Sequence, residues 1–89
     1  MIRKVDSAEV ITNLEARKKY RDKYIGFVTV EQKIIDFENE RIRVLYTADS
    51  DDESYEIPAM TEGGEFIARM EGLGVGGTNM GMGGILFYE

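Results

Sequence analysis

The chain contains no cysteine, and this absence constrains the fold more than any other feature of the sequence. Without disulfides, a chain of 89 residues must be held together by a noncovalent hydrophobic core. So short a chain is expected to form a single small domain over residues 1–89. A domain of this size buries only about 60 to 68% of the surface that its unfolded chain exposes, so modest stability is expected.

Histidine is also absent. Without cysteine and histidine, the chain lacks the usual general base at neutral pH, the thiolate nucleophile and the commonest transition-metal ligands. We therefore expect no catalytic residues, no metal site and no cofactor. An enzyme would need a pocket of carboxylates or lysines with perturbed pKa values, and no motif in the sequence indicates one.

The charge is unevenly distributed along the chain. Residues 1–23 hold seven Lys/Arg against four Asp/Glu, whereas residues 24–89 hold four against thirteen, within a net charge of −6. Such an acidic field makes nucleic acid an unlikely partner. No apolar stretch has the length of a signal peptide or a membrane span, so no membrane association is expected and a cytoplasmic location is predicted.

The N-terminal part predicts a helix that begins at Asp6 and ends near Asp22. Asp6 is placed to cap the helix, and Glu9 follows three residues later as in a capping box. Val5 and Val10 have the spacing of a hydrophobic staple across the same boundary.

The next part predicts strands. Residues 24–35 are rich in aromatic and β-branched side chains, and Ile42, Val44 and Tyr46 alternate with other residues at a period of two. The polar residues 36–40 between them favour an antiparallel hairpin. A third short strand is expected at residues 55–57, where Pro58 ends it.

Two further elements are expected in the C-terminal part. A second helix is predicted from about residue 61 to Gly72, because Phe66, Ile67, Met70 and Leu73 have the spacing of one helical face. The apolar run at residues 85–88 predicts a final strand. The expected fold is α+β and two-layered, with the order α-β-β-β-α-β and a mixed, mainly antiparallel sheet on which two helices pack.

Seven glycines lie within residues 72–84. Gly72 to Gly77 matches G-x-G-x-x-G as a text pattern, but a predicted helix precedes it and a strand follows, which is the reverse of a dinucleotide site. The favoured interpretation is a helix C-cap that leads into a loop. The alternative is a binding loop, with backbone N–H groups for an anion and with Met80 and Met82 as apolar contacts.

Two charged segments are further candidates. Residues 49–53 resemble the start of a calcium loop, but Ser54 and Met60 stand where the glycine and the final glutamate would be required, so a solvated loop is favoured. Residues 17–24 mix basic and aromatic side chains, although cations there also offset the negative end of the predicted helix.

The sequence therefore favours a non-catalytic module that binds a protein partner or itself. In a homo-oligomer, the basic helix end of one copy would meet the acidic loop of another. The alternative is a small-molecule or anion-binding domain that uses residues 72–84. The candidate contact residues are Asp49, Asp51, Asp52, Glu53, Arg17, Lys18, Arg21, Met80 and Met82.

Overall fold

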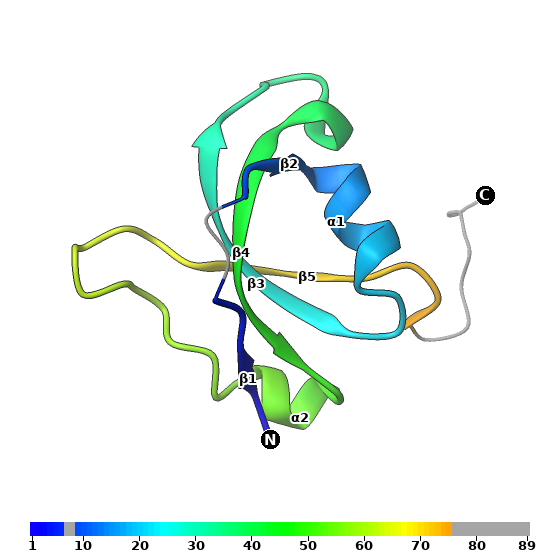
Figure 1. The fold of residues 1–89 in the computed structure, drawn as a ribbon, viewed down its shortest axis with the longest axis vertical. Helices are drawn as coiled ribbons and strands as arrows, with labels where there is room; N and C mark the ends of the chain where they lie inside the picture. Colours follow the sequence, from blue (N-terminus) through cyan, green and yellow to red (C-terminus); the bar gives the residue numbers. More distant parts are fainter. Residues whose placement is uncertain (7–8, 76–89) are drawn as a thin grey trace.

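The computed structural model describes residues 1–6 and 9–75, which form an α+β domain around an antiparallel sheet (Figure 1). The strands follow the order β1-β4-β3-β5, and β2 also pairs with β4. The elements are β1 (Arg3–Lys4), β2 (Ile11–Thr12), α1 (Asn13–Lys19), β3 (Tyr24–Glu31), the 3-10 helix η1 (Phe37–Asn39), β4 (Arg41–Ala48), α2 (Asp51–Ser54) and β5 (Ala68–Glu71).

The two expected central strands are confirmed as the antiparallel hairpin β3–β4. The pairing shifts twice, so that Leu45 and Val30 each stand as an extra residue in their strand. β3 ends at Glu31, so residues 32–35 belong to the loop between the strands rather than to the strand.

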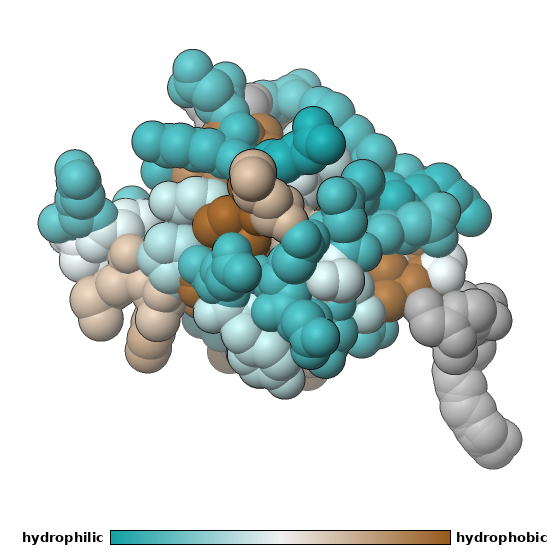
Figure 2. Space-filling model, turned by 90° about the horizontal axis from the view of Figure 1, so that it is seen from below, coloured by the Kyte–Doolittle hydropathy of each residue, from teal (hydrophilic) through white to brown (hydrophobic). Residues whose placement is uncertain are grey.

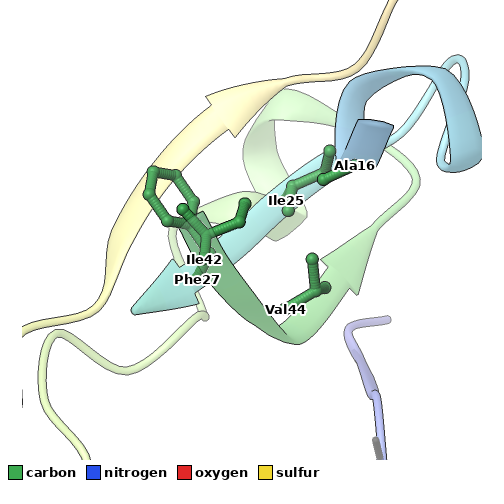
Figure 3. Close-up of a cluster of buried hydrophobic side chains, with 5 residues drawn as sticks. All are labelled: Ala16, Ile25, Phe27, Ile42 and Val44. Atoms are coloured by element: carbon green, nitrogen blue, oxygen red, sulfur yellow. The ribbon is translucent and has the colours of Figure 1, made fainter. Parts of the chain in front are cut away.

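One face of the sheet is covered by α1. Ile25, Phe27, Ile42 and Val44 point from the central hairpin into a cluster that Ala16 of α1 completes (Figure 3). Ile25, Ile42 and Ala16 are fully buried, and Met70 of β5 packs at the margin of this cluster. Burial of such side chains contributes about 1.5–3 kcal/mol each, so this cluster is a principal source of stability.

The opposite face carries a second cluster, because side chains alternate along β3. Val28 packs there with Ala48, Ile57 and Ile67. Gly26 faces Ile57 so closely that an added Cβ would lie 2.7 Å from its Cγ2 atom. The lack of a side chain at residue 26 therefore lets the segment after α2 lie against the sheet.

The predicted start of the first helix is wrong. Thr12, rather than Asp6, caps α1: its hydroxyl accepts a hydrogen bond from the Glu15 N–H (3.1 Å), and Glu15 Oε1 accepts one from the Thr12 N–H (2.9 Å). Ile11 and Thr12 pair with Ile42 and Arg41 of β4, which holds the chain before α1 extended. Both sites satisfy the capping pattern, and strand pairing selects the later one.

The third strand expected at residues 55–57 is also wrong. Ser50 caps the short helix α2 by accepting a hydrogen bond from the Glu53 N–H (3.2 Å), and residues 55–57 continue from it as a turn. The acidic residues 51–53 thus lie in the first turn of a helix, where the exposed N–H groups favour negative charge.

The helix expected at residues 61–72 is instead a tight turn followed by the strand β5. Residues 61 and 65 are joined by a backbone hydrogen bond of 2.9 Å around Gly63 and Gly64, and β5 follows at Ala68–Glu71. Ile67 and Met70 pack on opposite faces of the sheet, as a strand requires. Their spacing fits one face of a helix equally well, so the apolar pattern did not distinguish the two.

The α+β class and the antiparallel hairpin are confirmed, and the structure has two helices as expected, but the second is α2 (Asp51–Ser54) rather than a helix at residues 61–72. The order of elements agrees approximately, whereas the positions of the elements in the second half differ. The final strand expected at residues 85–88 lies outside the described residues.

Candidate functional site

A polar groove of about 320 Å³ lies between α2 and β5. Register pairing places Tyr24 opposite Glu71 at the start of β3, and the turn after α2 brings Tyr55 to the same place. The residues that line the groove are Tyr24, Asp51, Ser54, Tyr55, Arg69, Met70 and Glu71.

The groove combines one cation, two carboxylates and two aromatic rings. The Arg69 guanidinium lies over the Tyr55 ring, 4.5 Å from its centroid. Burial raises the pKa of Tyr24, and the negative charges of Asp51 and Glu71 raise it further, so its hydroxyl stays protonated at neutral pH. Among the described residues, no ion-pair partner lies against Asp51 or Glu71.

The structure separates the four acidic candidates. Asp51 lines the groove, and Asp52 is exposed on α2 outside it. Glu53 accepts a hydrogen bond from the Asp49 N–H (3.3 Å) and forms an ion pair with the amino group of Met1. Within residues 1–6 and 9–75, no group of three or more carboxylates is arranged to hold a metal ion.

Asp49 is held by Lys23. Its carboxylate accepts a hydrogen bond from the Lys23 Nζ, and this bond, together with the positive charge of Lys23, lowers the pKa of Asp49. The acidic segment is therefore joined within one molecule to the turn that follows α1.

The basic candidates lie at the end of α1. Arg17 donates a hydrogen bond from its Nε atom to the Glu71 carbonyl oxygen (3.2 Å), at the edge of the sheet. Lys18 and Arg21 are exposed. Only Arg17 contacts a groove residue, so the structure does not gather the three basic candidates into one site.

The first residues of the glycine-rich segment are built into the fold. The Gly72 N–H donates a hydrogen bond to the Lys23 carbonyl oxygen (2.8 Å), and the Leu73 N–H donates one to the Arg17 carbonyl oxygen (3.0 Å). An added Cβ at Gly72 would overlap the Tyr20 carbonyl oxygen, so only glycine fits there. Met80 and Met82 lie outside the described residues.

The β3–β4 loop carries a feature that the sequence interpretation missed. Ile34, Ile35 and Phe37 are exposed to 82%, 95% and 63%, although they lie close together in the sequence. The buried carboxylate of Glu40 accepts a hydrogen bond from the Lys33 N–H (3.2 Å). This bond draws the ends of the loop together, and the apolar side chains remain on its outer side.

The sequence contains one signal for this surface. Ile34 and Ile35 are consecutive, whereas a half-buried strand alternates apolar and polar residues. Their β-branched side chains favour strands in general, and on that ground the sequence predicts a strand that continues to residue 35.

The groove and the apolar loop lie at opposite ends of the hairpin: α2 is at the bottom of Figure 1 and the β3–β4 loop at the top. The end of the molecule that carries α2 and β1 is mostly hydrophilic, with small separate apolar areas (Figure 2). No helix in the part of the chain that the structure describes is long and apolar enough to span a membrane.

No protein-family model, no curated protein and no solved structure matches the chain.

Proposed function

We propose that this chain is a non-catalytic protein-interaction module that binds its partner through the apolar β3–β4 loop. The observation that carries the proposal is the exposure of Ile34, Ile35 and Phe37 at the outer side of this loop. Single exposed apolar side chains are common on soluble proteins. Three of them within four positions form a group of the kind that interfaces bury.

The energetic gain from covering this loop is substantial. Full burial of a large apolar side chain is worth about 1.5–3 kcal/mol. The loop ends are already joined by the bond from the Lys33 N–H to Glu40, and Asn39 Nδ2 donates a hydrogen bond to Asp36 Oδ2 (2.7 Å) within the loop. These bonds reduce the conformational entropy that binding removes, which favours affinity.

The charges around the loop indicate the kind of partner. Asp36 and Glu38 lie exposed beside the apolar side chains. A partner with an apolar pocket and a basic rim complements this arrangement. A second copy of this chain fits less well, because each copy carries a net charge of −6. The favoured occupant is therefore a different protein.

The proposal is tested by affinity capture with matched variants. The triple variant Ile34→Ser/Ile35→Ser/Phe37→Ser removes the apolar side chains from the loop. The control is Phe66→Ser, which removes an apolar side chain that is exposed to 78%. Phe66 lies at the end of the turn before β5, where it pairs with Met60 in an isolated β-bridge. We expect the wild type and the control to retain the same partner and the triple variant to lose it, with all three chains folded by circular dichroism.

Two results would contradict the proposal. One is capture of the same proteins by the triple variant as by the wild type. The other is a homodimer in sedimentation experiments that the triple variant abolishes, because the loop would then bind a second copy rather than a different protein.

The alternative function, an anion or small-molecule site at residues 72–84, receives less support from the residues described. The N–H groups of Gly72, Leu73 and Val75 donate hydrogen bonds to the carbonyl oxygens of Lys23, Arg17 and Gly72. These three donors are therefore not available to an anion. Residues 76–84 lie outside the described part of the chain, and for them the alternative stays a hypothesis.

A further inference from the structure

We propose that the groove between α2 and β5 is a binding site for an arginine side chain of a protein or peptide. The site consists of the Tyr55 ring face and the carboxylates of Asp51 and Glu71. It is independent of the proposed function, because Tyr24 marks the groove at one end of β3 and the apolar loop begins beyond the other end.

The first argument is that the Tyr55 ring already accommodates a guanidinium group. Arg69 lies 4.5 Å from the ring centroid, a distance at which a cation is attracted to the electron-rich face. Both side chains are exposed, so Arg69 occupies the ring face without being enclosed there. An arginine from outside the molecule can exchange with it without disturbing the core.

The second argument is the negative charge that remains in the groove. Asp51 comes from α2 and Glu71 from β5, so they face the same space from two elements. Neither carboxylate has an ion-pair partner among the described residues, and Arg69 is directed to the ring instead. A planar guanidinium stacks on an aromatic ring and bonds to carboxylates at the same time, which an ammonium does less well.

The third argument concerns an anion as the rival ligand. Among the described residues that line the groove, Arg69 is the only cation, and it shares the groove with two carboxylates. Within the groove, an anion would meet repulsion from both carboxylates, whereas a cation would meet repulsion from Arg69. Arg17 is also positively charged, but it bonds the backbone carbonyl of Glu71 at the edge of the sheet and does not line the groove. The groove therefore favours a cation.

The test uses N-acetyl-arginine amide as the probe, which has no carboxylate of its own. Binding is followed by two-dimensional NMR of the full chain at low salt, from the shifts of the amides of α2 and β5. Inorganic phosphate and N-acetyl-lysine amide are titrated in parallel. We expect saturable binding of the arginine probe at millimolar concentration, weaker binding of the lysine probe and no binding of phosphate.

The variants separate the roles of the groove residues. Asp51→Asn/Glu71→Gln is expected to weaken binding at least about fivefold, whereas Asp52→Asn, which removes a charge from the same helix outside the groove, is expected to change it less than about twofold. Tyr55→Leu is expected to weaken binding about two- to fivefold. Arg69→Gln removes the competing cation and is expected to strengthen binding by a similar factor.

The most informative variant is Arg69→Gln. Weaker binding of the arginine probe by this variant would overturn the proposal, and so would phosphate binding that the variant abolishes. Absence of saturable arginine binding to the wild type, or equal effects of Asp51→Asn/Glu71→Gln and Asp52→Asn, would overturn it as well. These outcomes do not bear on the β3–β4 loop, because no variant in this test alters it.

Discussion

Lys23 and Asp49 form an ion pair across the ends of β3 and β4. Tyr24 and Ala48 are register partners, so the two charged residues continue the ladder by one position beyond the last strand pair. The pair joins the turn after α1 to the start of the acidic segment. A basic and an acidic part of the sequence thus contact each other within one molecule. In a homo-oligomer held together by these parts, the contact would instead join two molecules.

Replacement of this aspartate should change the pH dependence of stability. The hydrogen bond from Lys23 lowers the pKa of Asp49 in the folded state, so the ionised carboxylate stabilises the fold above the ordinary aspartate value of about 3.9. This contribution is lost as the pH falls through the folded pKa. Urea unfolding should show Asp49→Asn to be less stable than the wild type at pH 7, with the difference vanishing towards about pH 2.

The control for this experiment is Asp52→Asn, which removes the same charge from α2 and leaves the ion pair intact. Its difference from the wild type should be smaller at pH 7. If the two variants behaved alike at every pH, the ion pair would not be the origin of the effect.

The position of the helix cap provides a second prediction. Thr12→Ala removes the hydroxyl that accepts from the Glu15 N–H and should destabilise the protein by about 1 kcal/mol. Asp6→Ala should change the free energy of unfolding by less than about 0.5 kcal/mol, because Asp6 lies outside the helix. Chemical denaturation of both variants decides between the two caps, and a larger loss at Asp6 would place the start of the helix there.

The close approach between Gly26 and Ile57 provides a third prediction. Gly26→Ala should destabilise the fold by about 1–3 kcal/mol, because the new methyl group would collide with Ile57. Gly63→Ala is the matched control, since the nearest atom to an added Cβ there is Thr61 Oγ1 at 3.7 Å. Its effect should stay within about 0.5 kcal/mol.

A double variant makes the cause of this effect specific. In Gly26→Ala/Ile57→Ala, the loss measured by urea unfolding should be smaller than the sum of the two single losses, because the added methyl occupies part of the space that Ile57 vacates. Additive losses would show that residue 26 acts through something other than contact with Ile57.

The central hairpin could be predicted because local patterns and tertiary pairing agree there. The alternation of Ile42 and Val44 places both on the buried face of β4, where the structure has them. The start of the first helix could not be predicted, because Asp6 and Thr12 both begin a sequence that satisfies a capping box. The pairing of Thr12 with Arg41, which decides between them, depends on residues far apart in the chain.

The second half was predicted less well for a related reason. Ile67 and Met70 are three residues apart, a separation that suits one face of a helix and also opposite faces of a strand. The groove could not be predicted without the correct assignment, because Arg69 and Glu71 line it from a strand that pairs with β3. Of its residues, Asp51 was one of the candidate contact residues taken from the sequence, and Tyr24 lay in the candidate segment 17–24.

The apolar loop was not predicted because the solvent exposure of Ile34 and Ile35 depends on strand pairing, which the local sequence does not determine. Ile34 and Ile35 have the composition of a buried strand, and the register shift at Val30 and the end of β3 at Glu31 leave them in solvent. Strand pairing thus determines whether these two residues form core or surface.

The most direct test of the protein-interaction function is site-specific photo-crosslinking. A photoreactive amino acid is placed at position 35 in the β3–β4 loop and, as a control, at position 66. We expect position 35 alone to give an adduct of one defined mass other than twice that of the chain. Excess wild-type chain should abolish this adduct, and excess Ile34→Ser/Ile35→Ser/Phe37→Ser chain should not. Absence of an adduct at position 35, equal adducts from position 66, or an adduct of two copies of this chain would contradict the proposed function.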